Sequence, residues 1–135
     1  ALPTRTHARR VLLLAGCATQ PPCPPGLSPA TLASAYFGRT AGGEEIVTDA
    51  AWTRFMDDAV TPAFPDGLTV LDGAGQWRGR AGTISRQRSK VLVVALPGGD
   101  AAEAQRRLAP VIATYRERFR QESVMVTTQA VCLGF

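Results

Sequence analysis

The stretch from Phe64 to Arg80, FPDGLTVLDGAGQWRGR, constrains the fold of this chain more than any other. Pro65-Asp66-Gly67 is a turn signal, because Pro fixes φ, Asp hydrogen-bonds its own backbone and Gly accepts positive φ. Residues 68–72 then alternate weakly between apolar and polar side chains, as half-buried strands do. Gly73-Ala74-Gly75 leaves the backbone bare, which suggests a β-bulge or the close approach of another group. The stretch therefore predicts a strand entered through a tight turn.

A strand and a helix precede this central strand. Residues 32–39, LASAYFGR, alternate small and large side chains and have the composition of a strand. Thr48-Asp49 is typical of a helix start, because a hydroxyl caps the first turn and an acid favours it. The apolar residues that follow recur at helical spacing and define one buried face. Pro62 is expected to end this helix.

A second strand-helix-strand set follows the central strand. Residues 79–88 indicate a hairpin loop, and residues 89–96, SKVLVVAL, are β-branched and apolar enough to form the next strand. The run 100–103, DAAE, is a capping box that opens a second helix. Pro110 is expected to kink or break that helix. Residues 122–135 predict the last strand.

The order β-α-β-β-α-β predicts an α+β fold, a ferredoxin-like βαββαβ sandwich with a four-stranded antiparallel sheet and two helices on one face. In that topology the end of the last strand lies near the start of the first. Cys132 would then approach Cys23, and in an oxidising compartment the two can form a disulfide. The alternative is two free thiols, one of them buried and one exposed.

Residues 1–17 have the features of an export signal. TRTHARR is basic, VLLL is apolar, and LAGC at 14–17 resembles the processing box of bacterial lipoproteins, in which the cysteine is lipidated and becomes the new N-terminus. We therefore expect a lipoprotein-type signal segment ending at a lipidated Cys17, a Pro-rich tether at 18–30 and a single α+β domain at 31–135. The predicted location is the bacterial cell envelope, anchored to a membrane through lipid and facing the periplasm. The alternative is a disordered tail with a strand-like VLLL.

Charge and composition exclude several classes of function. The chain has 15 basic and 11 acidic residues, but three arginines lie in the first ten residues, so residues 17–135 are almost neutral. Nucleic-acid binding is therefore not expected. The single histidine, His7, lies in the signal segment, so the domain lacks a histidine for a catalytic triad or a metal site. No metal and no cofactor is predicted.

The polar residues of the central stretch are the first candidate site. If the strand alternates regularly, Asp72 and Gln76 point to one side and Trp77 to the other, whereas a bulge would invert that relation. In a functional interpretation Asp72 is an acid or anchor, Gln76 and Arg78 donate to a ligand, and Trp77 is a wall. In a structural interpretation Asp72 pairs with an arginine such as Arg39, and Trp77 lies in the core.

A second candidate site comes from neighbouring strands. Tyr36, Arg39 and Lys90 could share one sheet face and bind an anion, because Arg forks onto carboxylates and Lys adds a point charge. Equally, these three side chains could simply cover an open sheet face.

Four segments of the chain resemble one family of small exported bacterial proteins. They are YFGR (36–39), the long run TDAAWTRFMDDAVTPAFPDGLTVLDGAGQWRG (48–79), SKVLVV (89–94) and YRERFRQESV (115–124), with W-x-x-F and G-Q-W as the specific parts of the long run. The family is the domain-of-unknown-function family 3574, whose members often carry lipoprotein signals. The resemblance implies an exported lipoprotein with a compact α+β domain and a cysteine near each end of it. It implies no activity.

Three functions remain open from sequence alone. The first is a membrane-tethered binding or interaction module that uses the uncovered sheet face for a partner or for a second copy in a homodimer. The second is a small enzyme without histidine or metal that acts on a small anionic or polar molecule through Asp72, Tyr36 or Arg39. The third is a structural component of the envelope. The first is preferred.

Overall fold

The computed structural model describes Gly16 and residues 22–135. The predicted lipidation site Cys17, nearly all of the predicted signal segment and residues 18–21 of the predicted tether lie outside the described residues. Within the described part, no helix is both long and apolar enough to cross a bilayer. The elements in chain order are β1 (Ser28–Gly38), β2 (Thr40–Ala41), β3 (Glu44–Glu45), α1 (Asp49–Phe55), η1 (Met56–Val60), α2 (Thr61–Ala63), β4 (Thr69–Arg78), β5 (Ile84–Pro97), α3 (Ala101–Arg118) and β6 (Met125–Leu133).

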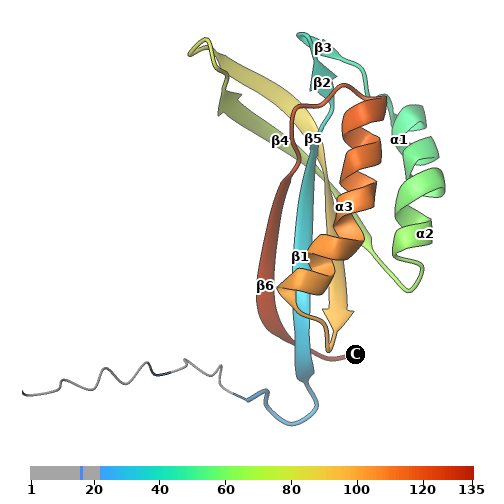
Figure 1. Ribbon diagram of the computed structural model, residues 1–135, viewed down its shortest axis with the longest axis vertical. Coiled ribbons are helices and arrows are strands. Elements are labelled where there is room, and N and C mark those ends of the chain that lie inside the picture. The colour runs from blue at the N-terminus through green and yellow to red at the C-terminus, as the bar shows by residue number, and fades with distance from the viewer. Residues whose placement is uncertain (1–15, 17–21) are drawn as a thin grey trace, which may run out of the picture.

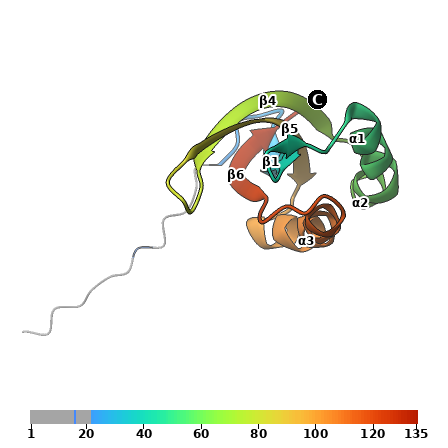
Figure 2. The ribbon, with the colours of Figure 1, turned by 90° about the horizontal axis from the view of Figure 1, so that it is seen from above.

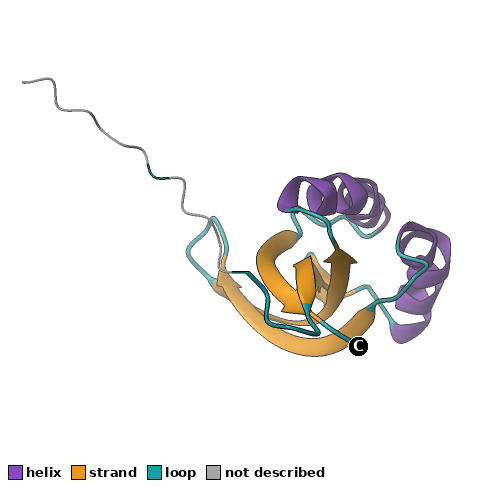
Figure 3. Cartoon of the chain, turned by 90° about the horizontal axis from the view of Figure 1, so that it is seen from below, coloured by secondary structure: helices purple, strands orange, loops and turns teal. Residues whose placement is uncertain are grey.

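Four strands form one antiparallel sheet in the order β4-β5-β1-β6, and the helices lie against one of its faces (Figures 1 and 2). Seen from below, both helical layers lie on the same side of the curved sheet, and the other side carries no helix (Figure 3). β2 and β3 form a separate two-stranded hairpin after β1. This is the ferredoxin-like α+β sandwich that the sequence predicts, with the prediction confirmed in strand order and helix placement.

An aromatic cluster holds the helices on the sheet. The Phe37 ring of β1 lies 4.7 Å from that of Tyr115 on α3 and 5.5 Å from that of Trp52 on α1, centroid to centroid. Phe55 and Phe119 complete the cluster with tilted or edge-on contacts. All five side chains are buried. Aromatic pairs in these geometries are worth about 0.5–1.5 kcal/mol each beyond their burial, so the cluster fixes how the helices sit on β1.

The structure confirms the predicted helix starts, but the predictions made for the two prolines are wrong. The Thr48 hydroxyl accepts from the Ala51 N–H, and the Asp100 carboxylate accepts from the Glu103 N–H, as predicted. Pro62 does not end the first helix, because it lies in the first turn of α2, where a missing N–H is tolerated. Pro110 does not break α3, since it faces solvent, where water can satisfy the carbonyl that the proline leaves without a donor.

The β4–β5 hairpin is longer than predicted. β5 begins at Ile84, so the expected loop shrinks to residues 79–83, and residues 74–88 extend beyond the end of β1 as a two-stranded arm (Figure 1). Pairing runs one to one from Thr69 opposite Val93 to Arg78 opposite Ile84. The predicted bulge at 73–75 is therefore wrong. The close approach is present instead, because a Cβ on Gly73 would lie 2.8 Å from the Ser89 hydroxyl oxygen.

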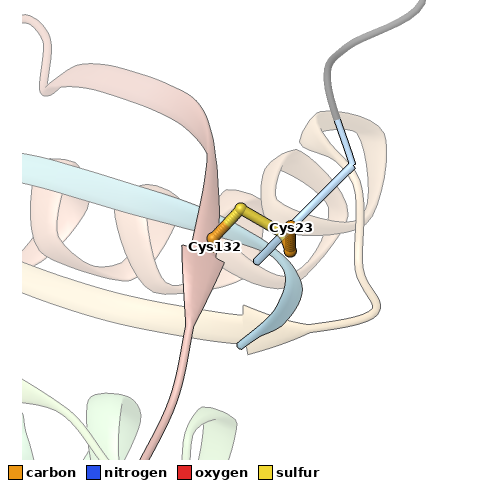
Figure 4. The surroundings of a disulfide bond; sticks show 2 residues. All are labelled: Cys23 and Cys132. Atoms are coloured by element: carbon orange, nitrogen blue, oxygen red, sulfur yellow. A yellow bond between two sulfur atoms is a disulfide. The ribbon is translucent and has the colours of Figure 1, made fainter. Parts of the chain in front are cut away.

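A disulfide joins the two ends of the domain. Cys23 and Cys132 are bonded with their Cα atoms 5.6 Å apart, as the topology suggests, and the alternative of two free thiols is wrong (Figure 4). β1 begins at Ser28, two residues before the predicted end of the tether. The ordered domain therefore includes the Cys23 segment, which sequence analysis assigned to the tether.

Candidate functional site

The sheet separates the predicted site residues onto two faces. Tyr36 of β1 lies opposite Val91 of β5, so the neighbouring Lys90 points to the other face, toward the helices. Arg39 also lies on the helix side, where its side chain is buried. The expectation that Tyr36, Arg39 and Lys90 share one face is therefore wrong for Tyr36, because strand alternation separates it from the two cations.

Arg39 is committed to structural contacts. Its Nε donates to the carbonyl oxygen of Val47 at 2.8 Å, and its Nη2 lies 2.8 Å from Asp49 Oδ1 and 3.5 Å from Glu45 Oε1. The residue is only 1% exposed. A buried guanidinium with these partners joins the β2–β3 hairpin and the start of α1 to the end of β1, and its burial keeps it from a ligand on the open sheet face.

Lys90 and Asp72 form a second part of the same charged network. Lys90 Nζ lies 2.6 Å from Asp72 Oδ1 and 3.8 Å from Asp49 Oδ1. The hydrogen bond and charge of Lys90 hold the pKa of Asp72 below its usual range. The structural interpretation of Asp72 is therefore correct in kind, although its partner is Lys90 and not Arg39. A carboxylate stabilised in its charged form is a poor general acid near neutral pH.

Arg88 and Glu45 extend the network to the arm. The Arg88 guanidinium donates to both Glu45 oxygens, and this hydrogen bond lowers the pKa of Glu45 and raises that of Arg88. Gln76 and Arg78 lie on the same face of the arm, beyond these pairs, and both are exposed. Arg78 donates to the carbonyl oxygen of Gly82 at 3.2 Å, within its own hairpin.

The uncovered face of the sheet carries a hollow at the foot of the arm. This open-face cleft has a volume of about 550 Å³ and lies between the arm, the β2–β3 hairpin and the segment that follows α3. The predicted candidate Tyr36 lines it, together with Trp77, and Gln76 borders it although strand alternation directs the Gln76 side chain to the other face. Trp77 is 47% exposed. It is therefore a wall of the cleft, as in the functional interpretation, and not part of the core.

Small residues create this hollow. Gly73, Ser89 and Gly38 lie opposite one another on β4, β5 and β1, and all three face the uncovered side. On one side of this row lies the row of Leu71, Val91, Tyr36 and Met125, and on the other lies the Trp77 ring on the arm. Neighbouring side chains fill the space above two of these glycines, because a Cβ on Gly38 would lie 2.8 Å from Gln87 Nε2 and a Cβ on Gly73 would lie 2.8 Å from the Ser89 hydroxyl oxygen. The room for a ligand group is therefore over Gly75, where a Cβ would have no neighbour closer than 4.0 Å.

The polar walls of the cleft are fixed by backbone contacts. The Gln87 Oε1 accepts from the Thr40 N–H at 3.3 Å, and the Gln121 Nε2 donates to the carbonyl oxygens of Thr40 and Phe119 at 3.0 and 3.1 Å. Arg120 lines the same wall with a φ of 50°, alone among non-glycine residues of the described part in having positive φ. Arg120 is the left-handed residue that ends α3, since the Gln121 N–H donates to the Arg116 carbonyl oxygen at 3.0 Å, as in common helix C-terminal motifs.

Tyr115 supports the cleft from the core. Its hydroxyl donates to the carbonyl oxygen of Gly38 at 2.6 Å, so it holds the end of β1 from the helix side. Burial raises the pKa of the Tyr115 phenol. Tyr115 therefore stays protonated at physiological pH and acts as a structural hydrogen-bond donor.

Sequence analysis missed most residues of the cleft. Gln87 and Ser89 fall in or beside the expected hairpin loop, so strand alternation was not applied to them, and Gln121, Arg120 and Met125 come from the end of α3 and the start of β6. The glycines at 38, 73 and 75 were the available signal, since bare backbone on adjacent strands marks close approach. In the part of the chain that the structure describes, no three His, Cys, Asp or Glu side chains are arranged to hold a metal ion.

The fold and the cleft define a small ferredoxin-like domain with one covered and one uncovered sheet face. The chain belongs to the family described as protein of unknown function (DUF3574), whose model matches residues 33–135. A search of curated proteins finds no match to the chain. The family prediction made from the sequence is confirmed.

Solved structures that resemble this chain share its architecture. A phage SAM lyase in complex with S-methyl-5'-thioadenosine matches with a TM-score of 0.61 and 16% identity, over 78% of this chain and 90% of that chain. The phage SAM lyase in its apo state gives 0.58 and 15%, over 87% and 97%. CPII, a nitrogen regulatory PII-like protein from Thiomonas intermedia K12, gives 0.45 and 14%, over 81% and 97%. At these identities the likeness to the phage SAM lyase shows the fold alone.

Proposed function

We propose that this chain is an exported, membrane-tethered binding domain of the bacterial cell envelope, and that its open-face cleft takes a small molecule with a flat ring. The observation that carries the proposal is the cleft itself. Aromatic side chains from two strands, Tyr36 and Trp77, stand on either side of a floor from which glycines have removed the side chains. Pockets of about 300–1,000 Å³ with apolar walls and a few fixed polar groups are typical of small-molecule sites.

The polar groups of the cleft favour a ligand with an amide-like or hydroxylated edge. Gln87 and Gln121 are each held by Thr40, so their positions are set before a ligand arrives. Ser85 and Ser89 add hydroxyl groups on the adjacent strand. Aromatic walls suit a planar ring, because stacking on Trp and Tyr tolerates many ring types. Pre-organised groups reduce the entropy lost on binding.

Binding fits the electrostatics better than catalysis. The carboxylate named as a candidate acid, Asp72, is ion-paired with Lys90 on the opposite face of the sheet from the cleft. The Tyr115 phenol is buried in the core. The carboxylate that lines the cleft, Glu122, belongs to the segment after α3 and not to the strands that carry the aromatic walls, so the site offers chiefly shape, stacking and hydrogen bonds.

Export is supported by the disulfide. Cys23 and Cys132 are bonded, and such bonds persist in oxidising compartments outside the cytosol. The LAGC box at 14–17 supplies the proposed anchor, six residues before Cys23. Membrane attachment through Cys17 and a periplasmic orientation are parts of this proposal.

The test fills the cleft without disturbing the fold. A Cβ on Gly75 would have the Gln87 carbonyl oxygen at 4.0 Å as its nearest neighbour, so Gly75→Val adds volume to the cleft without a clash. Ala74→Val is the matched control, because Ala74 is exposed on the opposite face of the same strand. Native mass spectrometry of the oxidised protein is run as purified and after addition of S-methyl-5'-thioadenosine, the flat-ring ligand of the phage SAM lyase.

A one-to-one adduct on the wild-type protein and on Ala74→Val, lost from Gly75→Val and from Trp77→Ala, would support the proposal. A wild-type protein that retains no small molecule and takes up none of the probe would contradict it. Undiminished adduct on Gly75→Val would place the binding site elsewhere and would overturn the assignment to the cleft.

A further inference from the structure

The uncovered face of the sheet bears no charged side chain. Strand pairing assigns to this uncharged face the residues that alternate away from the helices. They are Leu32, Ser34 and Tyr36 on β1, Thr69, Leu71, Gly73, Gly75 and Trp77 on β4, Ser85, Gln87, Ser89, Val91, Val93 and Ala95 on β5, and Met125, Thr127, Gln129 and Val131 on β6. Since 19% of the chain is charged, a whole sheet face without Asp, Glu, Lys or Arg is a strong departure from the rest of the surface.

Large apolar side chains on this face are open to solvent. Leu71 is 52% exposed, Trp77 is 47% exposed and Met125 is 58% exposed. They lie on both edge strands, with Val91 and Tyr36 between them, so the apolar surface continues across the sheet. Exposed apolar patches of this kind on a small domain mark interaction surfaces.

We infer that the uncharged face is an interface between two copies of this chain. The absence of charge on this face distinguishes between the partners that could bind it. A partner with charged groups in the contact would bury them without counter-charges, which is costly. A second copy presents the same uncharged surface, so nothing is left unpaired and no like charges meet.

The cross-strand rows of the face are complementary to themselves. One row reads Leu71, Val91, Tyr36, Met125 across the sheet, and the next reads Thr69, Val93, Ser34, Thr127. A two-fold axis parallel to the strands, between β5 and β1, places each row on the same row of the second copy. The apolar row then meets an apolar row, and the hydroxyl-bearing row meets its equivalent, as an isologous dimer requires.

The two central strands supply most of the contact area. β1 and β5 pair over nine residues, or about 30 Å, whereas all four strands share only three rows, because β4 and β6 extend toward opposite ends of the sheet. On the stated axis two copies therefore overlap over roughly 380 Å² each, or about 770 Å² for a pair, and an interface of this size fits a weak, reversible dimer. Stacked sheets pack about 10 Å apart, close enough for side chains of opposing central strands to touch.

Ser34 gives the sharpest test, because it lies on the central strand β1 next to the proposed axis and is already polar and half-exposed. Ser34→Asp and Ser34→Lys each place like charges on both copies across the interface. We expect either substitution to raise the dimer dissociation constant at least about a hundredfold, since opposed like charges cost several kcal/mol. Mixing the two variants should restore the dimer, because each pair then carries opposite charges.

Sedimentation velocity on the full chain in oxidised form, up to about 100 µM, measures the association of these variants. Gln105→Glu and Gln105→Lys are the matched controls, since Gln105 is exposed on α3 at the far side of the domain. A wild-type protein that stays monomeric, or a Ser34→Asp variant that associates like the wild type, would overturn the inference. Failure of the variants to re-associate on mixing would exclude the isologous arrangement.

The result is separable from ligand binding in the cleft. Gly75 lies on the arm, beyond the end of β1 and outside the rows that meet across the proposed axis, so Gly75→Val is expected to lose the ligand while retaining the dimer. Ser34→Asp is expected to lose the dimer, and adduct formation by its monomer is read separately by native mass spectrometry. Each proposal can therefore fail without the other.

Discussion

The hydroxyl of Tyr115 donates to the carbonyl oxygen of Gly38 at 2.6 Å, and this bond joins the aromatic core to the floor of the open-face cleft. Tyr115 belongs to α3 and packs against Phe37, while Gly38 ends β1. The core thus holds in place the strand end on which the cleft is built, so packing and binding geometry share one residue.

Removal of this hydroxyl should destabilise the domain. Tyr115→Phe keeps the ring but leaves the Gly38 carbonyl without its donor, and we expect a loss of about 1–3 kcal/mol in the free energy of unfolding. Urea unfolding measures it. Tyr36→Phe is the control, because Tyr36 lies on the uncovered face, and its loss should be within about 0.5 kcal/mol. Equal effects of the two substitutions would refute the structural role.

The same phenol predicts behaviour in alkali. Because burial raises the pKa of Tyr115, its contribution to stability is complete below the pKa of a free phenol and is lost as the pH rises through the folded-state pKa. In Tyr36→Phe, Tyr115 is the last tyrosine of the chain. Its tyrosinate absorbance should therefore appear only at a pH well above 10, together with loss of the folded state. Ionisation near the ordinary value in a folded protein would contradict this.

Lys90 should control the ionisation of Asp72. Lys90 lowers the pKa of this carboxyl, so the pair stabilises the fold above the unfolded-state pKa of Asp and loses its contribution as the pH falls through the lower folded-state value. Carboxyl NMR titration should show the Asp72 pKa below the ordinary range in the wild type and higher in Lys90→Met. Glu45, whose pKa is lowered by its hydrogen bond with Arg88, serves as the internal reference and should keep that lowered pKa in Lys90→Met. An unchanged Asp72 pKa would rule out the ion pair in solution.

Reduction of the disulfide should weaken the whole domain. The bond spans 109 residues of sequence. Loss of a bridge over such a loop costs about 2–5 kcal/mol in unfolding free energy. The measurement is urea unfolding with and without reductant. The double variant Cys23→Ser/Cys132→Ser should match the reduced wild type and should not respond to reductant. A wild type whose stability is indifferent to reductant would argue that the bond does not form in solution.

Membrane attachment should depend on one cysteine alone. Cys17→Ser removes the proposed lipidation site and should release the protein from the membrane fraction of its host, because single-residue lipid attachment is the proposed anchor. Cys23→Ser, which changes a cysteine only six residues away, should leave the protein with the membranes. Fractionation and immunoblotting compare them, and membrane retention of Cys17→Ser would disprove the anchor.

Local signals predicted the fold well. These signals depend on contacts within a few residues, and they are the Thr48 and Asp100 caps, the apolar face of α3 and the β-branched run in β5. The order of the elements then leaves few possible topologies. The prolines misled because their effect depends on position in a helix turn and on exposure. The length of β5 was underestimated because residues 85–88 are polar, and only their pairing with β4 makes them a strand.

The site was less accessible to sequence reasoning. Arg39 and Lys90 were predicted to share a face and Asp72 to pair with an arginine such as Arg39, but the observed partners depend on the register of three strands and on the β2–β3 hairpin. The cleft depends on the same register, since Gly38, Gly75 and Ser89 line it together only when β1, β4 and β5 pair in this way. The spacing of residues along the sequence does not indicate which of them become neighbours on adjacent strands.

The Cys23–Cys132 bridge has a mechanical consequence. Cys23 lies just before β1, and Cys132 lies near the end of β6, the strand that pairs with β1. A pull that enters the domain through Pro22 therefore reaches β1 and β6 together. The force cannot separate β1 from β6 by breaking one hydrogen bond after another, because the disulfide holds the ends of the two strands together. A domain linked in this way can bear a force applied at its N-terminal side, as on a moving or growing surface, while the cleft at the opposite end of the sheet keeps its shape.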